Sequence, residues 1–67
     1  MTPTDEELAA FCLWYQVHFH RKQSFSSVVT TALCGHFRTY SKRAEELLKR
    51  CRKLGLVRKK DDIVYFQ

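Results

Sequence analysis

The sequence predicts a mainly α-helical fold with a small β-hairpin, in the order helix-helix-helix-strand-strand. A capping box at Thr4 and Glu7 opens a stretch with apolar residues at helical spacing, and Ser41 precedes a second, strongly amphipathic stretch. Two short β-prone runs on either side of Asp61 and Asp62 predict the hairpin. A chain of 67 residues is long enough for one core, so we expect residues 1–67 to form a single domain.

The first helix is expected over residues 5–19. Thr4 and Glu7 can exchange hydrogen bonds between side chain and backbone, and Asp5 and Glu6 place negative charge where the helix dipole favours it. One face of this helix is apolar and is expected to pack into a core. This face consists of Leu8, Phe11, Cys12, Tyr15 and Phe19, and Leu13 and Trp14 widen it.

A second helix is expected through residues 28–37, with Ser26 or Ser27 as its N-cap. Its first four residues are β-branched and suit a strand about as well by propensity. The polar residues 20–27 before it are expected to form a connection. The helical alternative is supported by a stripe formed by Ala32, Leu33 and Phe37.

The third helix is expected over residues 42–54, with Ser41 as its N-cap, and most positions outside its apolar stripe are charged. Gly55 stands where a left-handed C-cap is expected, and Leu56 can make the hydrophobic contact of a Schellman motif. The apolar stripe consists of Ala44, Leu47, Leu48, Cys51 and Leu54.

The hairpin is expected from residues 56–60 and 63–67, which are rich in β-prone residues. Asp61 and Asp62 would form the tight turn between the strands. They lack the Asn-Gly or Asp-Gly pair that gives the strongest turn signal.

Positive charge is segregated along the chain. The net charge is +5, but all 12 Lys and Arg residues lie between Arg21 and Lys60, where only Glu45 and Glu46 are acidic. A clustered positive field indicates a polyanionic partner, and the alternative is a charged surface that only maintains solubility.

The cysteines and the N-terminal residues indicate a compartment. Cys12, Cys34 and Cys51 are an odd set at wide spacing, which favours free thiols in a reducing environment. The first residues are acidic, unlike a secretory signal, and no apolar run approaches the ~20 residues of a membrane span. We expect a soluble protein of the cytoplasm, associated with the nucleoid, or of the nucleus, without a membrane partner.

Residues 41–66, SKRAEELLKRCRKLGLVRKKDDIVYF, resemble the winged helix-turn-helix superfamily. In this segment a helix with the stripe Ala44, Leu48 and Cys51 leads through residues 54–57 into a charged strand and a returning apolar strand, and the two preceding helices extend the resemblance over nearly the whole chain. The resemblance implies a protein that binds double-stranded DNA, with its third helix in the major groove and its hairpin, the wing, near the backbone or minor groove. It implies a sequence-specific or architectural DNA-binding protein, such as a transcriptional regulator or an excision-type accessory factor of a phage or mobile element.

A helical wheel selects the residues of the third helix that would face DNA. Lys42, Glu46, Lys49 and Lys53 lie opposite the apolar stripe, flanked by Arg43 and Arg50. Lys and Arg can pair with phosphates or with guanine, and the N-terminal part of a recognition helix usually reads the bases. The acidic turn shifts the expected hairpin contacts to the first strand. The complete predicted set is Thr39, Ser41, Lys42, Arg43, Glu46, Lys49, Arg50, Lys53, Arg58, Lys59 and Lys60.

Metal binding and catalysis have weak support in the sequence. His18 and His20 are two residues apart, as are Cys34 and His36, and this spacing places ligands about 200° apart on a helix. A Cys–His nucleophile pair would also need an orienting group and an oxyanion site, and the sequence offers neither. We expect no metal, no cofactor, no small-molecule substrate and no enzymatic activity.

Two other binding modes remain open at this stage. Exposed aromatic residues could stack on single-stranded bases, although most should be core in so small a domain. The winged-helix resemblance also allows a protein-interaction module that makes no DNA contact, with a homodimer or partner surface formed by Phe11, Trp14, Tyr65 and Phe66.

Overall fold

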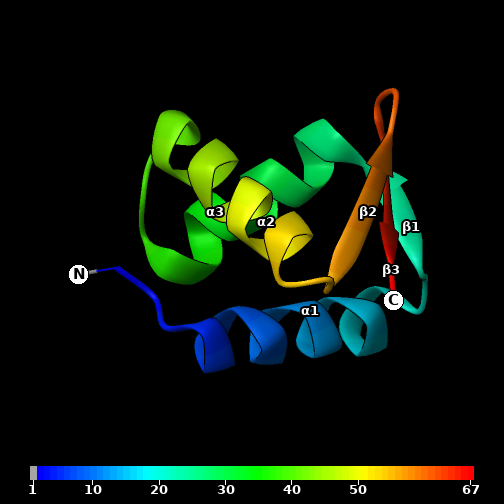
Figure 1. The fold of residues 1–67 in the computed structure, drawn as a ribbon, viewed down its shortest axis with the longest axis horizontal. Helices are drawn as coiled ribbons and strands as arrows, with labels where there is room; N and C mark the ends of the chain where they lie inside the picture. The colour runs from blue at the N-terminus through cyan, green and yellow to red at the C-terminus, as the bar shows by residue number, and fades with distance from the viewer. Residues whose placement is uncertain (1) are drawn as a thin grey trace.

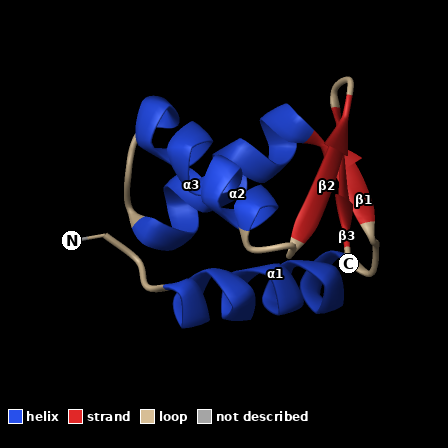
Figure 2. Ribbon diagram, in the orientation of Figure 1, coloured by secondary structure: helices blue, strands red, loops and turns tan. Residues whose placement is uncertain are grey.

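The computed structural model describes residues 2–67 and confirms three helices and a C-terminal β-hairpin (Figure 1). Helix α1 lies along one side of α2 and α3, and a three-stranded antiparallel sheet stands at the end of the molecule where α1 ends (Figure 2). The elements in chain order are α1 (Asp5–Phe19), β1 (Gln23–Phe25), α2 (Ser26–Phe37), α3 (Ser41–Lys53), β2 (Val57–Lys60) and β3 (Ile63–Phe66).

Strand β1 corrects the expectation of a plain connection over residues 20–27. It pairs antiparallel with β3, so the sheet order is β1-β3-β2 and the last strand of the chain is the central one. The Phe66 N–H donates to the Lys22 carbonyl at 2.8 Å, next to this ladder. A hairpin alone leaves one edge of β3 with unpaired backbone groups, and β1 satisfies them.

The start of α1 is as expected from the capping box. The Glu7 N–H donates to the Thr4 hydroxyl at 3.1 Å, and the Thr4 N–H donates to the Glu7 carboxylate at 2.8 Å. The helix ends at Phe19, and His20 adopts the left-handed conformation with φ 52°.

The serine caps expected for α2 and α3 are wrong. Ser26 and Ser41 are the first helical residues, and the N-cap residues Phe25 and Tyr40 make no side-chain capping bond. Phe25 is extended because it belongs to β1, and the Ser26 N–H donates to the Asp62 carbonyl at 2.7 Å. Backbone pairing with the hairpin turn thus takes the place of a side-chain cap at α2.

The β-branched run in α2 is helical because its polar members bond back to the helix. The Thr30 hydroxyl donates to the Ser26 carbonyl at 2.8 Å, and the Thr31 hydroxyl donates to the Ser27 carbonyl at 2.9 Å. Val29 is buried in the core. Tertiary packing and these local bonds outweigh the strand propensity of the segment.

The end of α3 is a Schellman motif, as the sequence predicts. Gly55 has φ 77°, and its N–H donates to the Arg52 carbonyl at 3.1 Å. The Leu56 N–H donates to the Cys51 carbonyl at 2.9 Å. Leu54 is the C-cap and is 42% exposed, so its assignment to the helix and to the core stripe is wrong. Asp61 and Asp62 form the hairpin turn, with Asp61 at φ 55°.

One core joins the three helices to the sheet. The Tyr15 ring is fully buried and stacks on Phe66, with 4.9 Å between ring centroids. Its hydroxyl donates to the buried Ser24 hydroxyl at 2.7 Å, which links α1 to β1. The buried hydrophobic residues are Leu8, Phe11, Cys12, Tyr15, Val29, Leu33, Ala44, Leu47, Leu48, Cys51, Val57, Val64 and Phe66.

The Tyr15–Ser24 bond gives a stability prediction. We expect Tyr15→Phe to lower the free energy of unfolding by about 1–2 kcal/mol, because it leaves the Ser24 hydroxyl buried without its donor. Urea denaturation measures the loss. Ser24→Ala should cost a similar amount, and the double variant should cost less than both losses together, whereas strictly additive losses would show that the bond contributes nothing.

Candidate nucleic-acid interface

An open groove between α3 and β2 gathers basic side chains. It has a volume of about 600 Å³, and its lining is basic except for Val57, which is buried. We call this surface the basic groove and define it by Lys49, Arg52, Lys53 and Lys59, whose side chains come from the two elements that form its walls.

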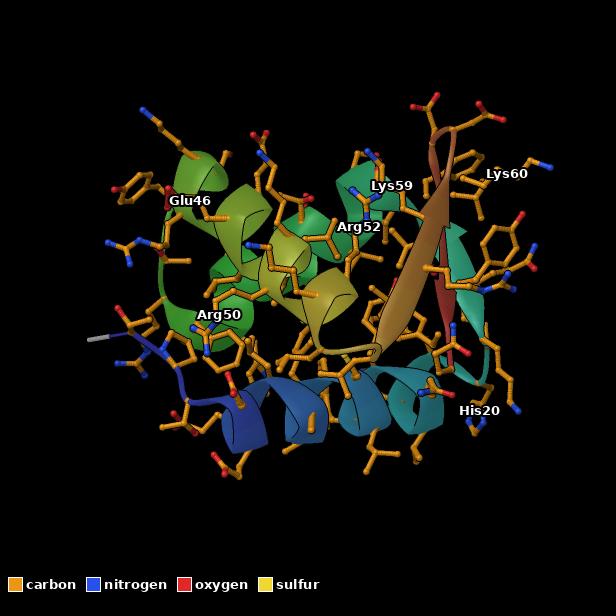
Figure 3. The ribbon with its side chains drawn as sticks, viewed as in Figure 1. His20, Glu46, Arg50, Arg52, Lys59 and Lys60 are labelled. Atoms are coloured by element: carbon orange, nitrogen blue, oxygen red, sulfur yellow. The ribbon has the colours of Figure 1, made fainter. Side chains whose placement is uncertain are left out.

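The local structure explains why these residues meet. Helix α3 turns its apolar stripe to the core, so Lys49 and Lys53, one turn apart, are left exposed. Side chains alternate along β2, and Lys59 therefore lies on the same face as buried Val57. In Figure 3, Arg52 of α3 and Lys59 of β2 lie close together between the helix and the strand, and both line the same two hollows.

The basic groove continues to the start of α2. A neighbouring hollow of about 450 Å³ is shared by Arg52, Lys59 and Lys49 with the hydroxyl residues Ser26 and Ser27. The first turn of α2 contains no acidic residue. The positive end of the α2 dipole therefore adds to the positive character of this surface.

No residue of the basic groove forms an ion pair within residues 2–67. The ion pairs of this part of the chain join Arg43 to Glu46 and Arg50 to Asp5, and none includes a basic-groove residue. Glu45 lies at the α2 side of the groove without such a pair. The four cations repel one another, and a bound anion would relieve that repulsion.

Six of the predicted DNA-contact residues line neither the groove nor its neighbouring hollow, and Thr39, Arg43 and Glu46 are three of them. Thr39 and Arg43 line a separate hollow with the N-terminal segment. The Arg43 guanidinium donates to the Thr2 hydroxyl at 3.2 Å and lies 3.7 Å from the Glu46 carboxylate. Glu46 and Arg43 therefore balance each other on α3.

Arg50 is held by the N-terminal segment. Its guanidinium donates to the Pro3 carbonyl at 2.9 Å and forms an ion pair with Asp5, at the start of α1. Figure 3 shows the Arg50 side chain directed toward that end of α1, away from Arg52. The structure thus gives Arg50 an intramolecular contact that Lys49 lacks.

Of the remaining predicted residues, Ser41 and Arg58 line the groove or its neighbouring hollow, whereas Lys42 and Lys60 do not. Ser41 lines the α2 side of the groove, and Lys42 is exposed on α3. Arg58 lines the groove, but its guanidinium lies over the Tyr65 ring, 5.9 Å from the centroid. Lys60 projects from the opposite side of β2 from Lys59 (Figure 3).

Arg52 is the groove residue that the helical wheel missed. The wheel selected the positions opposite the core and one flank, with Arg43 and Arg50, whereas Arg52 lies on the other flank of α3. In the fold that flank faces β2 and becomes a groove wall. A usable signal was present, since the Schellman motif after Lys53 returns the chain beside α3.

The cysteines and histidines form no comparable site. No group of three metal-ligating side chains occurs in residues 2–67. Cys12 and Cys51 are buried, and the hydrogen bond between them, together with burial, raises the pKa of the Cys12 thiol above its ordinary value. A thiol in that state is a poor nucleophile.

Comparison of the chain with protein families, with curated proteins and with solved structures finds no match. Within the described residues, no helix is long and apolar enough to cross a membrane. Functional inference therefore depends on the chemistry of the surface, and the basic groove is its most distinctive feature.

The contacts of Arg50 predict a stability role that its neighbour lacks. We expect Arg50→Gln to lower the free energy of unfolding by about 1 kcal/mol, since it removes a charged hydrogen bond and a partly exposed ion pair. Part of this effect should disappear at high salt. The matched variant Lys49→Gln should change stability by less than about 0.5 kcal/mol. Equal losses in urea denaturation would contradict the assignment.

Proposed function

We propose that this protein binds double-stranded DNA as a small winged helix-turn-helix protein, with α3 in the major groove. The observation that carries the proposal is the basic groove, where four cations from two elements converge without an acidic partner among residues 2–67. The order of three helices and three strands supports the fold assignment. Transcriptional regulation or an excision-type accessory role would suit so small a DNA-binding protein.

The dimensions of α3 suit this role. Its 13 residues give a length of ~20 Å, and a B-DNA major groove about 12 Å wide admits one helix. Lys42, Lys49 and Lys53 are exposed on it. Lys42, near the N-terminal end, is the best placed of these to reach a base edge, and the other two would bind phosphates.

The wall of the basic groove provides a second set of phosphate contacts. Arg52 can donate two parallel hydrogen bonds to one phosphate, and Lys59 adds a point charge beside it. The residues Ser26 and Ser27 line the neighbouring hollow, which Arg52 and Lys59 also line. The turn at Asp61 and Asp62 carries negative charge, so the tip of the hairpin would stay away from the phosphates.

A second candidate is a protein-interaction module that makes no DNA contact. The observation that favours it is the exposure of Leu13 and Val17 on α1, at 65% and 71%. The sequence predicts an interaction surface formed by four aromatic residues. Two of them, Phe11 and Phe66, are buried in the core, so only Trp14 and Tyr65 remain accessible for such a surface. We expect no catalytic activity from either candidate.

A salt titration of duplex binding tests the DNA proposal. We expect log K to fall linearly with log salt, and the combined variant Arg52→Gln and Lys59→Gln should reduce that slope by about 2, or ~0.9 for each lost phosphate contact. Fluorescence anisotropy with a labelled duplex measures both quantities. Lys22→Gln, an exposed lysine between α1 and β1, serves as the matched control and should leave the slope unchanged.

Two results would contradict the proposal. One is an absence of duplex binding by the folded protein at low salt. The other is binding whose slope responds to Lys22→Gln as strongly as to the loss of Arg52 or Lys59, because diffuse attraction and not the basic groove would then explain it.

A further inference from the structure

Helix α1 is apolar on two opposite faces. One face enters the core through Leu8, Phe11, Cys12 and Tyr15. The other is exposed, and it repeats at helical spacing through Ala10, Leu13, Trp14 and Val17, which we call the outer stripe.

Leu13 and Val17 of the outer stripe lie outside the fold's own packing, whereas the Trp14 ring also packs against His36 of α2, with 5.0 Å between ring centroids. Leu13 and Val17 are 65% and 71% exposed, and Trp14 is 40% exposed. In Figure 1, α1 lies at the edge of the molecule with α2 and α3 on one side of it and no element on the other. A surface helix ordinarily has one apolar stripe, so a second one indicates a partner.

The pattern around the outer stripe is symmetrical along the helix. Its midpoint lies between Leu13 and Trp14. Ala10 and Val17 are equally distant from this midpoint. Glu6 lies in the first turn of the helix, and Arg21 follows the C-cap residue His20 just beyond its other end. A two-fold axis at the midpoint of an antiparallel pair of α1 helices would place Ala10 opposite Val17 of the second copy, and it would bring Glu6 near the Arg21 that follows the end of the second helix.

Each pairing is chemically complementary. Leu13 would pack on the Trp14 ring of the second copy, and the small Ala10 would leave room for Val17. Glu6 would meet Arg21, and neither has an ion-pair partner among residues 2–67. The symmetry therefore matches apolar residues with apolar residues and an acid with a base.

The charges at the two ends of α1 select the antiparallel direction. The first turn contains Asp5, Glu6 and Glu7, and the last turn contains His18, followed by basic Arg21 and Lys22. Two parallel helices would align like charges and like ends of their dipoles. Two antiparallel helices align opposite ones.

We propose that a second copy of this chain covers the outer stripe, in a two-fold dimer with antiparallel α1 helices. The inference does not depend on DNA binding, because the outer stripe and the basic groove share no residue. A 15-residue helix is ~22 Å long, and one helix pair is small beside a standard interface of roughly 800 Å² per partner. The dimer should therefore be weak, with a dissociation constant on the order of 10–100 μM.

Sedimentation equilibrium of the full chain tests the dimer. We expect the average mass to rise from the monomer toward the dimer between about 10 μM and 1 mM protein, since this range spans the expected dissociation constant. Val17→Lys should weaken dimerisation at least tenfold. Phe25→Lys adds the same charge at a residue on β1 that is 61% exposed, and it should leave the dimer intact. Circular dichroism verifies that both variants are folded.

A charge exchange tests the direction of the helices. Glu6→Arg and Arg21→Glu should each weaken the dimer severalfold, because each brings like charges together, and the double variant should restore it. A monomeric mass up to about 1 mM protein would overturn the proposal. A dimer that Val17→Lys does not weaken, or one that the double exchange does not restore, would overturn it as well.

Discussion

The burial of the α3 stripe determines where the charged residues of this helix lie. Ala44, Leu47 and Cys51 are almost completely buried, so every charged residue of α3 is forced to the flanks or the outer face. The Schellman motif at Gly55 then returns the chain beside α3 as β2. Lys59 of β2 therefore lies next to Arg52 of α3. The two elements together form a basic surface that neither would form alone.

The basic residues of α3 consequently have different structural roles despite their similar chemistry. Arg50 faces the N-terminal segment, where the Pro3 carbonyl and Asp5 hold it, and it joins α3 to the start of α1. Lys49, its neighbour in the sequence, faces the groove and has no such partner among residues 2–67. A rotation of 100° between adjacent residues is enough to separate a stabilising cation from one available to a ligand. The outer stripe of α1 lies on another part of the surface, so the proposed polyanion and the proposed second copy would not compete for the same residues.

Local signals predicted much of this fold, and long-range contacts account for the errors. The capping box of α1, the amphipathic α3 and the Gly55 motif follow from neighbouring residues, and the structure has all three. Strand β1 could not be predicted, because three residues carry too little pattern and the strand forms only where β3 offers a free edge. The N-cap of α2 was misplaced for the same reason, since Ser26 bonds to the distant Asp62. Arg52 was missed because a helical wheel cannot show that a later strand packs along one flank.

Amide chemical shift mapping with a short duplex at low salt is the most direct test of DNA binding by the basic groove, because it would report where on the fold a duplex binds. If the basic groove binds the duplex, shifts should occur over residues 49–60 and at Ser26 and Ser27, which line the neighbouring hollow. The chemical shifts of the Leu13 and Val17 amides on the outer stripe should not change when the duplex is added at constant protein concentration. Shifts that cluster on α1, or no shifts at all, would show that the basic groove is not a DNA-binding surface.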